Sequence, residues 1–330
     1  MFLYIGAKDG LHVHQADATS AAWRHVQILS NEDGFTRFIL HTNKKMLYGL
    51  HAARPLISAF AIEAQTGKLR LVNLTHSGGL HPASVTFSGH GRCLLVAHAA
   101  SSHLGIVPVA ADGALRHARP AIALPGPARA QDVIMDPGGR FAVVTDPNKN
   151  NLIVLRFDPV TGQASSHQIL RARPADAPHR AVFHPTMKLL YVSNAGNSNV
   201  SAYHWNAAIG RLSFAQSIRT IPSDWPAKNI AADIAIGADG RYLYLANRGH
   251  DSLAIFAIQP GRGKLFMRAR EALGRTPHGL AWNSDRTRLL VANRDSNSIA
   301  RYAVILANGM LTRQEPDLPA DQPTAIALLD

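Results

Sequence analysis

The chain has 330 residues, of which 46% are apolar and 17% charged, a balance typical of a globular protein rather than a disordered one. Its single cysteine, Cys93, excludes an intramolecular disulfide, and no apolar run approaches the roughly 18 residues that span a membrane. The N-terminus lacks the features of a signal peptide, so we expect a cytoplasmic protein. The formal net charge of +12 favours an anionic partner. Lys and Arg form no dense run, which argues against nucleic acid.

A unit of about 47 residues recurs along the chain. Each copy has a short apolar strand, a polar turn, a second apolar strand that ends in a polar residue, and then a third and a fourth strand. One anchor residue can be aligned at the start of each first strand, at intervals of 47, 48, 48, 53, 46 and 46 residues: Thr36, Ala83, Gln131, His179, Ala232, His278 and Thr324. Four strands in a repeat of this length predict a β-propeller blade.

The two ends of the chain complete each other. Residues 323–329 form a first strand with nothing after it, and the chain begins with a second and a third strand that have no first strand before them. Joined, they make one blade from both termini and leave no open edge. The sequence therefore predicts an all-β, seven-bladed propeller of four-stranded blades, closed by the terminal strands, as a single domain over residues 1–330. The joined blade is counted below as blade 1.

A site is expected where the repeats meet the central axis, because the innermost strands of a propeller line its channel. The second strands end at equivalent positions, which we expect to converge there: Ala7, His51, His98, Asp146, Asn194, Asn247 and Asn293. Lys8, Arg248 and Arg294 follow three of these ends, and three anchors add Gln131, His179 and His278. A cationic funnel of this kind suits a carboxylate or phosphate ligand, and the imidazoles offer acid–base groups near neutral pH.

Structural interpretations compete with this one. The Asn residues that end three second strands are favoured in turns, where they bind their own backbone. Arg248 and Arg294 could instead tie adjacent blades together through carbonyl groups or through Asp251 and Asp295. A histidine at the start of a strand can also serve packing alone.

Other chemistries find little support in the sequence. There is no H-E-x-x-H motif, no cysteine cluster and no set of carboxylates suited to calcium, so we predict neither a metal ion nor a cofactor. His12 and His14 lie on one face of a strand and are interpreted as surface residues. No G-x-S-x-G nucleophile motif is present, and Cys93 lies in an apolar strand typical of a core.

Two stretches resemble a known family. They read PHRAVFHPTMKLLYVSN from Pro178 and AADIAIGADGRYLYLANRGHDSLAIFAI from Ala231, and they are similar to the seven-bladed lactonases, which include bacterial 6-phosphogluconolactonases and a fungal carboxymuconate-cyclizing enzyme. The resemblance extends over nearly the whole chain. It implies a seven-bladed propeller, in agreement with the repeat count, and an activity that opens or forms a lactone.

The resemblance also implies site positions, and this chain departs from several of them. The family combines a His in blade 4, an Arg after Pro and a Glu after Asn in blade 5, and an Arg in blade 6. At those positions this chain has Gln131, His179 followed by Arg180, Ala195 and Arg248. In blade 7, the usual Pro-Arg-Gly reads Pro-His-Gly, with His278 in the middle. The family carboxylate is therefore replaced by an alanine.

We predict a lactone hydrolase, or a lactone-forming cycloisomerase, that acts on an anionic or polyhydroxylated sugar-type lactone. His179 or His278 would activate water, and Arg248 would stabilise the developing negative charge. The expected substrate-binding residues are Lys8, His51, His98, Gln131, Asp146, Arg180 and Arg294. The alternative hypothesis is a non-catalytic propeller that binds a small anion or a protein partner, which the missing carboxylate favours.

Overall fold

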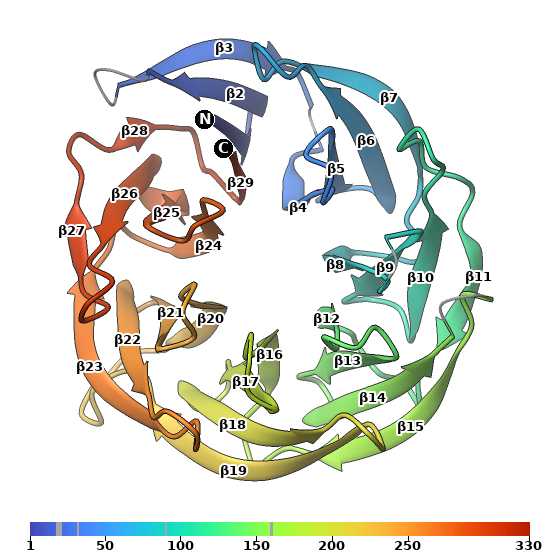
Figure 1. Ribbon diagram of the computed structural model, residues 1–330, viewed down its shortest axis with the longest axis vertical. Helices are drawn as coiled ribbons and strands as arrows, with labels where there is room; N and C mark the ends of the chain where they lie inside the picture. The colour runs from blue at the N-terminus through green and yellow to red at the C-terminus, as the bar shows by residue number, and fades with distance from the viewer. Residues whose placement is uncertain (18–21, 32, 90, 159–160) are drawn as a thin grey trace.

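The computed structural model describes residues 1–330 except 18–21, 32, 90 and 159–160. Seven antiparallel sheets stand around a central axis, as Figure 1 shows in a view along that axis. Within the described ranges the remaining regular element is a single 3-10 helix, η1 (Arg294–Ser296). The same ranges hold no helix long and apolar enough to cross a membrane.

The strands of the first four blades follow, from the axis outward. Blade 1 contains β29 (Ala325–Leu329), β1 (Phe2–Ala7), β2 (Gly10–Ala16) and β3 (Trp23–Leu29). Blade 2 contains β4 (Phe35–Leu40), β5 (Met46–His51), β6 (Leu56–Ile62) and β7 (Leu69–His76). Blade 3 contains β8 (Pro82–Phe87), β9 (Cys93–His98), β10 (His103–Pro108) and β11 (Arg119–Ala123). Blade 4 contains β12 (Asp132–Met135), β13 (Phe141–Asp146), β14 (Asn151–Phe157) and β15 (Ala164–Arg171).

The last three blades complete the ring. Blade 5 contains β16 (Pro178–Phe183), β17 (Leu189–Asn194), β18 (Asn199–Asn206) and β19 (Arg211–Arg219). Blade 6 contains β20 (Ile230–Ile236), β21 (Tyr242–Arg248), β22 (Ser252–Ile258) and β23 (Leu265–Ala272). Blade 7 contains β24 (Pro277–Trp282), β25 (Arg288–Asn293) and β26 (Ser298–Val304). Its outer position is divided between β27 (Leu311–Arg313) and β28 (Leu318–Pro319), which both pair with β26.

The predicted closure is confirmed. β1 pairs antiparallel with β29, from Phe2 opposite Leu329 to Gly6 opposite Ala325, so both chain ends lie within one blade (Figure 1). The seven anchors also fall at the starts of the innermost strands, and the second strands end at the predicted residues, β21 continuing by one residue to Arg248. The repeat thus located the strands nearest the axis residue by residue.

The core is divided into seven parts, each between two neighbouring blades. Every cluster of buried apolar side chains draws on two adjacent sheets, as in the cluster that joins blades 1 and 2 through Tyr4, Phe35 and Phe60. Because a sheet buries its apolar faces only against another layer, the last blade must meet the first. Closure of the ring and burial of the core are therefore one requirement.

Polar ties repeat between the blades. On four second strands a buried tyrosine hydroxyl donates to a glycine carbonyl in the next blade, as Tyr48 does to Gly113 at 2.9 Å and Tyr191 to Gly263 at 2.8 Å. Further out, an amide side chain on a fourth strand exchanges two hydrogen bonds with the backbone of the next fourth strand, as Gln168 does with Leu212. These contacts satisfy groups that burial between blades would otherwise leave unpaired.

Candidate active site

The innermost strands are bulged where the anchor residues stand. In blades 2, 3, 5 and 7 the ladder skips one residue, so that Thr36, Ala83, His179 and His278 have no partner on the second strand. Blade 6 has a longer irregularity between Ala231 and Ile234. A bulge breaks the strict alternation of faces and re-aims side chains. It allows an anchor residue and the residue after it to serve the same site.

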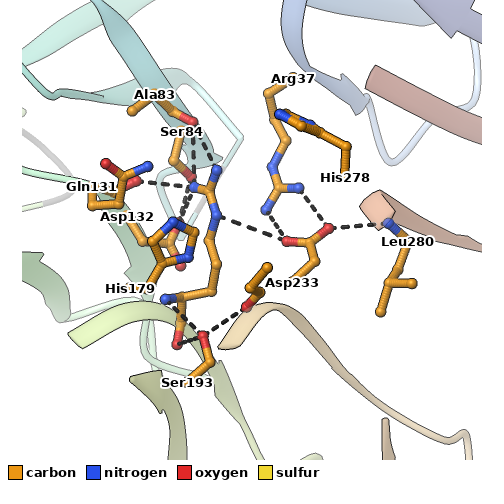
Figure 2. A network of polar contacts seen from close by, with 12 residues as sticks. Arg37, Ala83, Ser84, Gln131, Asp132, His179, Ser193, Asp233, His278 and Leu280 are labelled. Atoms are coloured by element: carbon orange, nitrogen blue, oxygen red, sulfur yellow. Dashed lines mark hydrogen bonds and ion pairs between the residues drawn. The ribbon is translucent and has the colours of Figure 1, made fainter. Parts of the chain in front are cut away.

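The residues that follow the anchors carry a charged network across the axis. The guanidinium of Arg37 on β4 donates to both carboxylate oxygens of Asp233 on β20, at 2.9 and 3.0 Å (Figure 2). Blades 2 and 6 are three positions apart in the seven-membered ring. This ion pair therefore spans the axis rather than joining neighbours, and Figure 2 shows the fork between the two side chains.

Arg180 connects the other side of this network. Its guanidinium donates to the carbonyl oxygens of Ala83 and Gln131 and lies 3.4 Å from Asp132 and 3.8 Å from Asp233. Asp132 also accepts from the hydroxyl of Ser84 and from the backbone N–H of Ala181. One arginine thus links blades 3, 4, 5 and 6 at the axis.

These contacts decide the charge of the buried groups. Burial alone would raise the pKa of Asp233, but the charge and hydrogen bonds of Arg37 outweigh it and hold that pKa below its usual range. Burial and the charge of Arg37 lower the pKa of Arg180 to about 10, so it remains protonated at neutral pH. The network is a set of full charges, not of neutralised groups.

His179 supports an arginine. Its imidazole is 9% exposed, and its Nε2 lies 3.4 Å from a terminal nitrogen of Arg248. A guanidinium only donates, so Nε2 of His179 accepts and the ring proton lies on Nδ1. Burial, followed by the charges of Arg180 and Arg248, lowers the pKa of His179 far below its usual value. This histidine is neutral, and its lone pair is directed to Arg248.

His278 has the same tautomer as His179, but a different neighbour fixes it. Its Nδ1 lies 3.0 Å from the carbonyl oxygen of Thr324, which only accepts, so Nδ1 carries the proton. Nε2 therefore keeps its lone pair, and no protein hydrogen bond to it is found among the described residues. Burial and the charge of Arg248 lower the pKa of His278 to about 4. The ring is neutral and has a free acceptor nitrogen.

Arg248 is the arginine of this network that has no carboxylate partner among the described residues. Three guanidinium groups, of Arg37, Arg180 and Arg248, face the two carboxylates of Asp132 and Asp233. Within the described residues Arg248 has no carboxylate within ion-pair distance, and its buried Nε has no hydrogen-bond partner. Burial is the first cause that lowers its pKa. A half-buried guanidinium with an unused N–H suits an anion or an oxyanion.

The histidines and the charged network occupy successive positions along the innermost strands. His179 and His278 are themselves anchor residues. Arg37, Arg180 and Asp233 each directly follow an anchor. The side chain of Arg37 is 27% exposed and that of Asp233 only 7%, so solvent reaches the network. We call His179, His278, Arg248, Arg37, Arg180 and Asp233 the axial site.

The ends of the second strands lie elsewhere. His51 binds Asp33 and Ser58, His98 binds Ser77, and both side chains are at most 4% exposed. Asp146 accepts from the backbone N–H groups of residues 129, 148 and 149 and is fully buried. Their partners are turns and third strands, not the axis. The expected convergence of these residues is not seen, and we remove all three from the substrate-binding set.

The remaining predicted residues are divided. Gln131 gives its backbone carbonyl to Arg180, and Figure 2 shows its position beside the network. Lys8 is exposed in a turn and Arg294 is exposed in η1, at the same end of the propeller, and the charge of Arg294 contributes to the lowered pKa of Arg248. The suggested pairing with Asp251 and Asp295 is not found in the described part of the chain. Those two carboxylates bind residues 249 and 276 instead.

Sequence reasoning missed two of the six residues of the axial site and the adjoining Asp132. Arg37, Asp132 and Asp233 were not singled out, although each directly follows an anchor, as Arg180 does. The signal was a repeat position occupied by charged residues inside apolar strands, where a lone charge is costly and a pair is expected.

Fold and site together define a class of protein: a closed propeller with a cationic, histidine-bearing site on its axis. The family model described as "Lactonase, 7-bladed beta-propeller" matches residues 3–328, and the chain belongs to this family.

Similar proteins agree in length and fold. The chain is 24% identical over 336 residues to a 6-phosphogluconolactonase of Bacillus subtilis, covering 98% of this chain and 95% of the relative. It is 26% identical to a 6-phosphogluconolactonase of Formosa agariphila, covering 94% and 92%. The structure of the periplasmic gluconolactonase PpgL of Pseudomonas aeruginosa superposes with a TM-score of 0.90 at 19% identity, covering 98% of each chain. The last comparison bears on the fold alone.

Proposed function

We propose that the protein opens an anionic or polyhydroxylated sugar-type lactone, such as 6-phosphogluconolactone, at the axial site. Membership of the lactonase family and relatives named 6-phosphogluconolactonase support a lactone hydrolase. Both axial histidines are protonated on Nδ1, and the observation that carries the assignment of roles is what faces Nε2 in each. His278 has a free Nε2 lone pair, whereas that of His179 is directed to Arg248.

The reaction assigns one task to each group. Nε2 of His278 removes a proton from water, and the hydroxide attacks the lactone carbonyl carbon. The carbonyl oxygen becomes an oxyanion beside Arg248, whose position His179 fixes. The intermediate collapses with cleavage of the ring C–O bond, and the leaving oxygen takes the proton back from His278. The product is an open hydroxy acid, which releases the second proton of the water to solvent, and its carboxylate remains beside Arg248.

Ala195 bears on the alternative function. The family carboxylate is absent at this position, and the pKa of His278 is about 4 in the free protein, which makes it a weak base. A bound anionic substrate would offset the charge of Arg248 and raise that pKa. If it did not, the axial site would bind a lactone or a related carboxylate without turnover, as a non-catalytic propeller.

The test is NMR-monitored opening of a lactone panel with the spontaneous rate subtracted. The panel contains 6-phosphoglucono-, glucono- and muconolactones. We expect His278→Ala to lower kcat at least roughly 100-fold, as loss of a general base does. Arg248→Ala should lower kcat/KM by roughly 100-fold, as loss of an oxyanion contact does. His179→Ala acts through Arg248 and should cost less than either.

The pH dependence of kcat/KM distinguishes the general base His278 from the positioning residue His179. Because the pKa of His278 is lowered to about 4, its neutral form persists to low pH, and kcat/KM should fall only as the pH drops through about 4. His278→Ala removes that step, whereas His179→Ala keeps it. A panel without enzyme-dependent opening, combined with tight binding of a lactone or sugar acid, would instead assign the binding function.

A further inference from the structure

Three histidines meet on the two outer strands of blade 1, whereas the axial site lies at the innermost strands. His12 and His14 stand two residues apart on β2, and His25 stands opposite His14 on β3. The ring centroids are 6.3 Å apart for His12 and His14, 5.6 Å for His12 and His25, and 5.2 Å for His14 and His25. One nitrogen of each ring lies within 4.8 Å of the others.

His14 is buried, but one of its ring nitrogens has no hydrogen-bond partner among the described residues. The side chain of His14 belongs to a residue only 8% exposed, and its Nδ1 is buried without a hydrogen bond among the described residues. The interpretation of both His12 and His14 as surface residues is therefore wrong for His14. A buried, unpaired ring nitrogen is destabilising unless another group binds there. Its ring contacts two other imidazoles, those of His12 and His25.

A carboxylate completes the arrangement. Asp9 in the turn before β2 lies 2.8 Å from Nε2 of His12. Metal-binding histidines commonly donate their second ring N–H to a carboxylate, which fixes the tautomer and leaves the other nitrogen for the ion. With Nε2 of His12 bound to Asp9, its Nδ1 remains available.

We propose that His12, His14 and His25 form a binding site for a divalent transition-metal ion of the zinc type, with Asp9 as the group that orients His12. Three imidazoles suit Zn²⁺, Ni²⁺ or Cu²⁺, whereas Ca²⁺ and Mg²⁺ prefer oxygen ligands. Tetrahedral zinc needs nitrogens roughly 3.4 Å apart, which follows from Zn–N bonds of about 2.0 Å. The nitrogens lie within 4.8 Å of one another, so binding requires the three side chains, of which His25 is exposed, to draw closer together.

The ion would hold the closing blade together. Its ligands come from β2 and β3, the third and fourth strands of the sheet that joins the two chain ends (Figure 1). β1 binds β29 on the inner side of this sheet, so a metal bridge on the outer side would clamp the opposite edge. The site is thus structural, and it leaves lactone chemistry at the axis unchanged.

Calorimetric titration of the untagged full-length chain with Zn²⁺ tests the site. We expect one equivalent to bind, and His12→Ala and His25→Ala each to weaken binding at least tenfold, because each removes one ligand. His204→Ala is the matched control, since His204 is an exposed histidine on the third strand of blade 5. It should leave the affinity unchanged.

Two further measurements guard against a trivial result. Co²⁺ bound in place of Zn²⁺ should give the intense visible absorption of a tetrahedral ion, and His25→Ala should abolish it. A hundredfold excess of Zn²⁺ over its Kd should raise Tm by roughly 4 °C in the wild type but not in His25→Ala. Absence of stoichiometric Zn²⁺ binding, or binding that survives both His12→Ala and His25→Ala, would overturn the proposal.

Discussion

Two rings of repeat-equivalent residues lie at the same end of the propeller, yet they differ in what they contact. The ends of the second strands hold polar residues that are almost fully buried and bonded to nearby turns and connections, as His98 is to Ser77 between blades 2 and 3. The starts of the innermost strands hold residues that contact distant blades, as Arg37 does Asp233 across 196 residues of sequence. One ring bonds to turns, and the other contributes the charged contacts that cross the axis.

The bulges explain the difference. The second strands pair regularly up to their last residues, so their side chains keep the alternation of the sheet. The innermost strands skip a residue at the anchor, and the extra residue turns side chains toward the axis. The repeat position of a residue therefore predicts its height along the propeller axis. The direction in which its side chain points depends on the local strand pairing.

The largest effect is expected at the centre of the axial site. Asp233→Ala leaves the buried guanidinium groups of Arg37 and Arg180 without their shared carboxylate, and should lower the free energy of unfolding by about 3–5 kcal/mol. Urea denaturation measures it, with the exposed Asp224→Ala as control. A loss below about 1 kcal/mol would mean that the network does not hold the blades together, and that its charges serve the ligand alone.

Substitutions at the ends of the second strands should lower stability more than activity, the opposite of what we expect for the axial histidines. His98→Ala removes a fully buried imidazole that bonds Ser77, and should lower the free energy of unfolding by about 1–3 kcal/mol. Lactone opening in the folded fraction should change less than about threefold, because in the described part of the chain the His98 side chain bonds Ser77 and no residue of the axial site. Urea denaturation and NMR kinetics on the same sample decide it. A large loss of activity without a loss of stability would return His98 to the substrate-binding set.

The same contrast shows how far the sequence could lead. Seven anchors and the apolar runs around them predicted the fold, the closure and the ends of the second strands, because strand periodicity and turn residues are local signals. The partner of Arg37 could not be read in this way, since a long-range ion pair leaves no local trace. The meeting of His25 with His12 and His14 depends likewise on the register of β2 against β3, which shifts by one residue at Val13.

The hydrogen-bond partners of the two axial histidines are a second example. His179 and His278 occupy matching repeat positions, and the sequence offered both as bases. Their neighbours differ: a guanidinium donor faces His179, and a carbonyl acceptor faces His278. Identical side chains at equivalent positions thus receive different roles from one contact each.

The smallest effect is expected at the exposed rim of the axial site. Arg294 lies in solvent near Arg248, and a charge there attracts an anionic substrate without touching the reacting carbonyl. Arg294→Ala should raise KM for 6-phosphogluconolactone about two- to fivefold, in line with a surface ion pair of up to about 1 kcal/mol, and leave kcat unchanged. The increase should shrink in 0.5 M salt and be absent for uncharged gluconolactone, because screening removes a long-range charge effect. An equal loss of kcat for both lactones would place Arg294 among the groups that contact the reacting atoms and extend the axial site outward to the rim.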